Sequence, residues 1–198
     1  MTQQDRRLEV AEAAWRVIVR EGLDRTSMRA IAQEMGCTTG VVTHYFRNKQ
    51  ELILFALHQV AERLQKLMEQ AVAEQSGGDR LVAMLSSFLP IDQERQEILR
   101  VWVAFLGYAV GRDDLMVDHQ ESAGQLRQMV MQELVELQQQ QIIKSDINPE
   151  MEANVLLALV NGVSLDTLIQ RNHLNPHQQK TALRNYVNGL LTKQFEQP

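Results

Sequence analysis

Apolar residues recur every three or four positions along this chain, and no segment shows a convincing two-residue alternation. In the first such stretch, for example, Leu8, Ala11, Trp15 and Ile18 form one helical stripe. Only four prolines and ten glycines interrupt a sequence rich in strong helix formers. The pattern therefore predicts an all-α protein. We expect nine helices, at approximately residues 8–21, 27–35, 38–46, 48–75, 79–89, 92–110, 114–141, 148–170 and 176–194.

Capping residues mark several helix boundaries. Gly36 favours a helix end, because glycine enters the left-handed conformation without a steric penalty. Asn48 followed by Glu51 has the pattern of a capping box at the start of the fourth helix. Asn148-Pro149 and Asn175-Pro176 each place a capping side chain before a proline at the first helical position, which predicts two further helix starts.

The second and third predicted helices are short and are joined by a tight turn that contains Gly36. Two short helices joined in this way form a helix-turn-helix, whose second helix fits the major groove of DNA. Helical spacing turns Cys37, Val42 and Phe46 toward the core. It leaves a set of small residues facing outward, which suggests a docking surface, whereas the alternative is a helical hairpin with a purely structural role. The outward set is Thr39, Gly40, Val41 and Thr43.

Charge is distributed unevenly along the chain, which has a net charge of −5. Residues 1–50 contain eight Lys or Arg and six Asp or Glu, a net charge of +2, whereas residues 51–198 contain 12 and 19, a net charge of −7. A slightly cationic head on an acidic body is typical of a protein that touches DNA at one end. At the start of the fourth helix, the ammonium of Lys49 and the nearby backbone N–H groups are suited to bind a phosphate.

The segment from residue 8 to residue 57 resembles the DNA-binding region of the tetracycline-repressor (TetR) family. The shared residues keep a fixed spacing: Arg29-Ala30-Ile31-Ala32, Gly36-Cys37-Thr38, Gly40, Tyr45-Phe46, Lys49 and Leu52. The resemblance implies phosphate contacts from Ser27, Thr38, Tyr45 and Lys49, and groove contacts from Arg29, Thr39, Gly40 and Thr43. We add His44 to this candidate set. Family members often carry Lys where this chain has Thr39 and Tyr where it has Thr43, so the operator sequence does not carry over.

We place a DNA-binding domain at residues 1–50 and a regulatory and dimerisation domain at residues 51–198. The last two predicted helices carry broad apolar stripes, and two copies of this helix pair would form a four-helix bundle. The sequence therefore predicts a homodimer, which one short recognition helix per chain also needs in order to read a palindromic operator. The stripes consist of Leu156, Val160 and Val163 in one helix and Leu183, Val187 and Leu190 in the other.

The larger domain also offers candidates for a small-molecule site. Val101–Phe105 and Leu159–Val163 resemble the TetR subgroup that contains the betaine-pathway repressor. Aromatic walls with a few polar groups are typical of ligand pockets, although the same residues would also make an ordinary core. We expect Asn161 and Asp166 to form a buried polar pair that serves a ligand or the dimer interface. The full candidate set is Met84, Phe88, Trp102, Phe105, Tyr108, Met129, Asn161 and Asp166.

These features predict a transcriptional regulator, and specifically a repressor that a small-molecule effector releases from its operator. A ligand-insensitive DNA-binding regulator and an activator are alternatives. An enzyme is a remote alternative: Asp118, His119 and Tyr108 carry suitable groups, but no nucleophile–base spacing or Gly-rich phosphate loop supports a reaction. We expect no cofactor and no bound metal, since a proline interrupts the one histidine pair with ligand spacing, His173 and His177.

No segment predicts membrane insertion or secretion. The first twenty residues lack the continuous apolar stretch of a signal peptide. The apolar segment Ile98–Gly111 contains Arg100 and is too short to span a bilayer. The single cysteine, Cys37, excludes an internal disulfide and suits a reducing compartment. We therefore expect a cytoplasmic protein.

Overall fold

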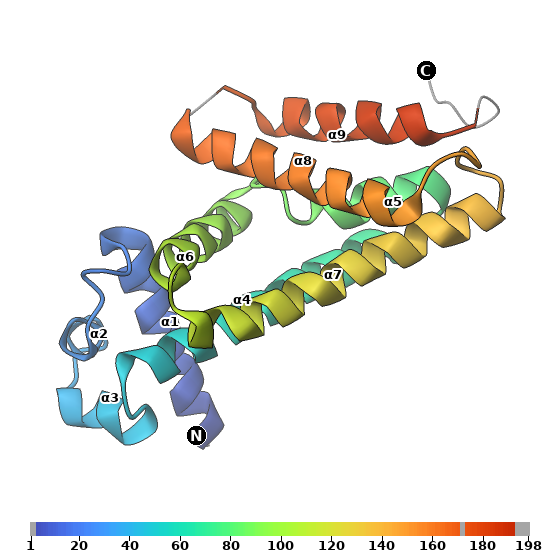
Figure 1. Ribbon diagram of the computed structural model, residues 1–198. Helices are drawn as coiled ribbons and strands as arrows, with labels where there is room; N and C mark the ends of the chain where they lie inside the picture. The colour runs from blue at the N-terminus through green and yellow to red at the C-terminus, as the bar shows by residue number, and fades with distance from the viewer. Residues whose placement is uncertain (1–2, 171–172, 193–198) are drawn as a thin grey trace. The chain divides into compact units, whose positions relative to one another are not determined.

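A computed structural model describes residues 3–170 and 173–192, apart from the side chains of Asp113, Asp114 and Asp118. Over these residues the chain forms nine helices and no β-strand, which confirms the all-α prediction (Figure 1). The helices are α1 (Gln3–Glu21), α2 (Met28–Glu34), α3 (Thr39–Tyr45), α4 (Lys49–Val72), α5 (Gly77–Ser86), α6 (Gln93–Ala109), α7 (Asp113–Gln139), α8 (Pro149–Ile169) and α9 (Pro176–Leu190).

The chain divides into two compact units. Unit 1 contains the described residues up to 63 together with residues 97–116. Unit 2 contains residues 64–96 and the described residues from 117 onward. The helices α4, α6 and α7 therefore contribute residues to both units.

Unit 1 has a small core in which α1 packs against α2 and α3. The face of α1 that enters this core carries Val10, Ala13, Ala14 and Val17, not the stripe that the sequence pattern suggested. The predicted stripe lies on a second face, where Leu8, Ala11 and Trp15 line a pocket. Helix α1 is thus apolar on two sides. One side packs against α2 and α3, and the other lines the pocket together with residues of α4 and α6.

The helix N-caps predicted at Ser27 and Asn48 are confirmed, with one difference in detail at Asn48, whereas α1 and α5 begin earlier than predicted, at Gln3 and Gly77. The Ser27 hydroxyl accepts a hydrogen bond from the backbone N–H of Ala30 (3.1 Å), and the Asn48 side chain accepts one from the N–H of Glu51 (2.8 Å). The Glu51 carboxylate, however, accepts from the N–H of Arg47 (2.8 Å), one residue before the position that a capping box requires. It therefore closes the turn between α3 and α4.

Unit 2 has a larger, leucine-rich core to which α5, α7, α8 and α9 contribute. Helix α5 packs against both α8 and α9, and α8 packs against α9 (Figure 1). Arg80 of α5 donates to the Glu133 carboxylate of α7 (3.0 Å) and to the carbonyl oxygen of Val72 at the end of α4 (3.2 Å). This ion pair, in which Glu133 is buried and Arg80 is partly exposed, links α5 to α7, and the bond to Val72 links α5 to α4.

Helix α9 ends four residues before the predicted boundary at residue 194. At Leu190 the chain turns into an extended segment, in which the N–H of Thr192 donates to the carbonyl oxygen of Ile142 (2.9 Å). The carbonyl oxygen of Leu190 in turn accepts from the N–H of Lys144 (3.0 Å). These backbone hydrogen bonds join the end of α9 to the loop after α7. Residues 193 and 194 lie outside the described part of the chain.

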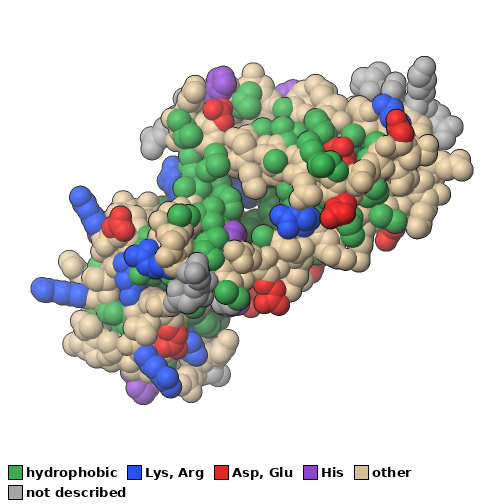
Figure 2. All heavy atoms as spheres, viewed as in Figure 1, with side chains coloured by type: hydrophobic (Ala, Val, Ile, Leu, Met, Phe, Trp, Pro, Cys, Tyr) green, Lys and Arg blue, Asp and Glu red, His purple; other side chains and the backbone are tan. Residues whose placement is uncertain are grey.

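The assignment of the two predicted apolar stripes to the dimer interface is wrong. Most of the stripe residues are buried in the core of their own chain, so they are not available to a second copy. The opposite side of α8 is instead uncovered and also apolar, with Met151 64% exposed and Ile169 78% exposed, and with Val155 and Leu165 beside them. Figure 2 shows hydrophobic side chains at the surface of unit 2. The buried stripe residues are Leu156, Val160, Leu183, Val187 and Leu190.

Helix α8 is also the one described helix that is long and apolar enough to cross a membrane, judged by length and composition alone. Only 22% of its most apolar stretch is buried. The sequence expectation considered Ile98–Gly111 and overlooked this helix. An exposed apolar helix face also suits a protein partner.

Candidate DNA-binding surface

The helices α2 and α3 and the turn between them form a helix-turn-helix. Gly36 adopts a φ of 65°, a left-handed conformation that lets the chain leave α2. The N–H of Cys37 then bonds back to the carbonyl oxygen of Ala32 (2.9 Å) and fixes the turn. Thr38 occupies the N-cap position of α3, but its hydroxyl makes no capping hydrogen bond. The Thr38 hydroxyl therefore has no capping role in the free protein.

Helix α3 presents the predicted faces. Val42 and Phe46 are fully buried, Cys37 packs partly against the core, and the outward residues are exposed. The Thr43 hydroxyl donates to the carbonyl oxygens of Thr39 (3.1 Å) and Gly40 (3.2 Å) in its own helix. Such bonds are weak alternatives to an external partner. The outward residues are Thr39, Gly40, Val41, Thr43 and His44.

Gly40 is not required by the packing of this chain. A Cβ atom added there would meet only the Thr38 hydroxyl, at an ordinary contact distance of 3.7 Å. A glycine within a helix lowers helix stability relative to alanine. The fold of this chain therefore gives no reason for a glycine on the exposed side of α3.

Lys49 points toward its own chain and is half-buried. Its ammonium donates to the carbonyl oxygen of Leu23 (2.6 Å) and lies 5.4 Å from the centroid of the Tyr108 ring. Burial lowers the pKa of Lys49. Arg112 contacts the same ring, with its guanidinium 4.2 Å from the centroid. An ammonium has three donors, so the bond to Leu23 leaves the group able to meet a phosphate.

Sequence reasoning missed Arg7, which supports the end of α3. Its guanidinium lies 4.7 Å from the ring centroid of Phe46 and 4.8 Å from that of Phe55. It also pairs with Glu51 (3.4 Å), the carboxylate that receives the N–H of Arg47. These partners are distant from Arg7 in the sequence, so no local pattern points to the contact.

Two arginines of α1 hold α2. The Glu34 carboxylate accepts hydrogen bonds from Arg16 (2.8 Å) and from Arg20 (2.8 Å), which lower its pKa. Arg29, at the start of α2, is exposed, as are Arg25 and Arg47. Figure 2 shows Lys and Arg side chains on the surface of unit 1. The candidate surface therefore combines an exposed small-residue helix face with exposed cationic side chains.

The aromatic ligand candidates of unit 1 are part of its packing. Phe105 is buried, Trp102 is half-buried, and the Tyr108 ring contacts the cations of both Lys49 and Arg112. Tyr108 therefore contacts a residue of the candidate DNA-binding surface, which the sequence did not predict.

The candidates of unit 2 do not form one site within that unit. Met84 is buried in the core and Phe88 packs against it, whereas Met129 is 38% exposed beside a shallow groove on α7. The predicted buried polar pair is wrong: Asn161 is exposed, and the Asp166 carboxylate instead meets the ring of His173 (2.6 Å).

The groups named for an enzymatic alternative are not brought together by either unit. Tyr108 belongs to unit 1 and His119 to unit 2, and burial lowers the pKa of His119. The side chain of Asp118 lies outside the described residues. Among the side chains that the structure describes, no cluster of three His, Cys, Asp or Glu has the geometry of a metal site.

Comparison with known proteins gives matches over most of the chain. Residues 10–55 match the model for bacterial regulatory proteins of the tetR family, and residues 77–192 match the C-terminal model for BetI-type transcriptional repressors. The chain is 28% identical over 189 residues to the regulator PksA of Bacillus subtilis strain 168, covering 94% of this chain and 90% of PksA. It is 23% identical over 197 residues to the regulator BetI of Vibrio vulnificus strain YJ016, covering 94% and 93%.

A protein from Saccharomonospora viridis, solved in complex with choline, has the same fold. The two structures superpose with a TM-score of 0.89 at 18% sequence identity, covering 96% of this chain and 100% of the other.

Proposed function

This chain belongs to the TetR family of transcriptional regulators, and we propose that it represses its target genes as a homodimer bound to a palindromic operator. The observation that carries the proposal is the outward face of α3. Gly40 is exposed on this face, although the packing of the chain does not require a glycine there. The major groove of a DNA duplex admits a helix closely, and small side chains on that helix can then contact the base edges.

We assign the DNA contacts to residues 1–50. Arg29, Thr39, Gly40 and Thr43 would meet base edges, with His44 beside them on α3. Ser27, Thr38, Tyr45 and Lys49 would meet phosphates, which fix the position of the protein on the duplex. The hydroxyls of Thr38 and Thr43 support this division, because neither is used in capping α3 and both are exposed.

We assign dimerisation to the uncovered side of α8, together with α9, within residues 51–198. Burying Met151, Val155, Leu165 and Ile169 against a second copy would remove from water the apolar side chains that a single chain leaves exposed. This arrangement also accounts for the membrane-like composition of α8 in a protein that we place in the cytoplasm with its DNA.

We further propose that a small-molecule effector controls DNA binding. A relative with the same fold binds choline, and choline is therefore a rational first probe. We keep Trp102, Phe105 and Tyr108, which belong to one unit, as the candidate contacts. Tyr108 has a direct route to the DNA-binding surface through Lys49. An effector releases DNA only if it binds more tightly to the conformation that does not bind DNA. DNA must then lower the affinity for the effector by the same factor as the effector lowers the affinity for DNA.

The experiment that tests the proposal combines a gel shift on DNA from upstream of the gene with the substitution Gly40→Ala. Alanine fits the free protein and favours a helix, so thermal stability should not fall, whereas operator affinity should drop at least about tenfold because the Cβ meets the duplex. Gly124→Ala on α7 is the matched control, because its added Cβ would meet no atom within 4 Å. Unchanged operator affinity in Gly40→Ala would contradict the proposed interface.

A further inference from the structure

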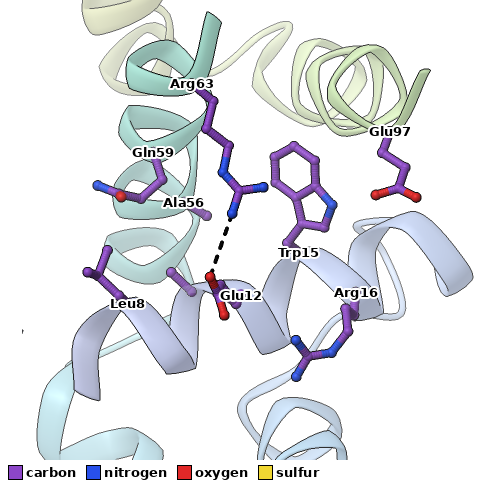
Figure 3. Close-up of a pocket in the computed structure, with 9 residues that line it drawn as sticks. Leu8, Glu12, Trp15, Arg16, Ala56, Gln59, Arg63 and Glu97 are labelled. Carbon is purple, nitrogen blue, oxygen red and sulfur yellow. Dashed lines mark ion pairs between the residues drawn. The ribbon is translucent and has the colours of Figure 1, made fainter. Parts of the chain in front are cut away.

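A pocket of about 200 Å³ lies within unit 1 between α1, α4 and the part of α6 that belongs to this unit (Figure 3). Leu8 and Ala11 of α1 and Ala56 of α4 provide apolar walls, and the indole of Trp15 forms one side. The remaining lining residues are polar or charged: Glu12, Arg16, Gln59, Arg63 and Glu97. None of these residues belongs to the candidate DNA contacts or to the candidate effector contacts.

The pocket already holds a cation that the chain itself supplies. The guanidinium of Arg63 lies 5.4 Å from the centroid of the Trp15 ring and 3.6 Å from the Glu12 carboxylate. Figure 3 shows the Arg63 side chain extending from α4 into the space between Trp15 and Glu12. An aromatic face beside a carboxylate is a favourable environment for a delocalised cation.

Arg63 is a weakly held occupant. Its distance to Glu12 is long for an ion pair, and the two side chains are 43% and 55% exposed, so solvent screens the attraction. A long arginine side chain at an exposed helix position can move its charge into water at little cost. A second cation could therefore take the place of the guanidinium.

The lining charges favour a cation over an anion. The Glu12 carboxylate, which faces the Arg63 guanidinium, would repel an anion placed on the Trp15 ring. The Arg16 guanidinium is bonded to Glu34 of α2 (2.8 Å), so its charge is already matched outside the pocket. An organic cation would also cover the apolar walls, because its hydrophobic body can pack against Leu8, Ala11 and Ala56.

We propose that this pocket is a second small-molecule site, which binds a small amidinium- or guanidinium-type organic cation on the face of Trp15 in place of Arg63. The volume is below the roughly 300–1,000 Å³ of sites for drug-sized ligands, which restricts the ligand to a small molecule. The site lies in the same unit as the helix-turn-helix, and α1 contributes to both. It is distinct from the effector contacts proposed above.

The test uses the full-length protein without DNA, with benzamidinium as the probe and its neutral isostere benzamide as the comparison. The chain has two tryptophans, so a ¹⁵N spectrum should show two indole N–H signals. Benzamidinium should shift the Trp15 signal, which a Trp15→Phe spectrum assigns, and should leave the Trp102 signal in place. Benzamide should bind at least about fivefold more weakly, because it lacks the charge.

Two exposed positions, Glu12 and Arg63, give variants with opposite expectations, and the half-buried Glu9 gives a control. Glu12→Gln should weaken the binding of benzamidinium about three- to fivefold, because it removes the negative charge beside the Trp15 ring. Arg63→Gln should tighten binding at least about twofold, because it removes the internal competitor. Glu9→Gln, which makes the same change of charge on α1 outside the pocket, should have no effect.

Two results would overturn the proposal. The first is a Trp15 signal that does not respond to benzamidinium, or that responds equally to benzamide. The second is binding of benzoate that Arg63→Gln abolishes, since this would make Arg63 the anchor of an anion site. Both results concern a ligand and not DNA, so they would leave the proposed repression of transcription standing, just as a failed gel shift would leave this pocket untouched.

Discussion

Helices α3 and α8 each leave one side uncovered in the single chain, but the chemistry of the two sides is opposite. The side of α3 carries Thr39, Gly40 and Thr43, which are small or polar, whereas the side of α8 carries residues as large and apolar as Leu165 and Ile169. Burying a large apolar side chain contributes about 1.5–3 kcal/mol, which small polar residues do not. Small polar residues instead allow close approach and directional hydrogen bonds.

We propose from this comparison that the two helices have different tasks. The apolar side of α8 would supply affinity for a second copy of the chain, and the side of α3 would discriminate between base pairs. Most of the affinity for DNA would come from contacts between cationic groups and phosphates. If this division is correct, substitutions on the two helices should fail in different ways.

The largest effect is expected on the uncovered side of α8. Leu165→Glu places a charge in the proposed dimer interface, and burying an unpaired charge costs roughly 3–5 kcal/mol. The dimer dissociation constant should therefore rise at least about 100-fold in analytical ultracentrifugation, while the helical circular dichroism is retained. Val117→Glu, at a 58% exposed position of α7, is the control. A Leu165→Glu protein that remains dimeric would place the interface elsewhere.

The two sides of α8 should also differ from each other in stability. In the Leu165→Glu background, Leu156→Ala should lower the free energy of unfolding by about 2–5 kcal/mol, because Leu156 is fully buried. Met151→Ala, at a 64% exposed position, should change it by less than about 0.5 kcal/mol. Urea unfolding at one protein concentration measures both. Equal losses would mean that the inner and outer sides of α8 have been assigned incorrectly.

On α3, discrimination and affinity should separate. Thr43→Ala should reduce the free energy of binding to the preferred operator by about 1–3 kcal/mol. The reduction should be smaller on sequences altered at the base pair that Thr43 contacts. Lys49→Ala should instead weaken binding to all sequences alike. It should also reduce the slope of log binding constant against log salt concentration (the salt slope) by about one unit. Binding titrations at several salt concentrations test both. A normal salt slope in Lys49→Ala would show that the ammonium stays on Leu23 in the complex.

The smallest effect concerns the packing of α9 against α8. The Tyr186 hydroxyl donates to the Glu152 carboxylate (2.7 Å), and burial together with this bond raises the pKa of Tyr186 to about 12. Tyr186→Phe should cost about 1 kcal/mol near neutral pH. The unfolded chain ionises near pH 10, before the folded one, so the contribution of Tyr186 should be lost as the pH rises from about 10 to 12. A pH-independent difference between the two proteins would contradict the assigned cause.

The sequence predicted the parts of the fold that local signals determine. Ser27 and Gly36 mark helix boundaries through their own chemistry, and the alternation of Val42 and Phe46 with small residues specifies which side of α3 is buried. The inner side of α8 could not be predicted in the same way. The helix is apolar on nearly every side, so the spacing of its apolar residues does not indicate which side faces the core. Asn161 was misplaced for the same reason.

Contacts between distant segments also escaped prediction. The stacking of Arg7 on Phe46 and Phe55 and the bond from Lys49 to Leu23 depend on how helices meet, not on a local pattern. The lining of the pocket in unit 1 comes from three helices. Trp15 was visible in the sequence as an apolar stripe residue, but its neighbour Arg63 was not predicted.

The most direct test of the central claim is hydroxyl-radical footprinting on an operator selected from random DNA by the purified protein. A homodimer that inserts one α3 helix into each half-site should protect two patches related by a dyad axis, with centres about 34–36 Å apart, or further if the heads are spread. Leu165→Glu should abolish this pattern. A single asymmetric patch from wild-type protein, or protection that Leu165→Glu leaves unchanged, would contradict the claim that two copies of this chain read a palindrome.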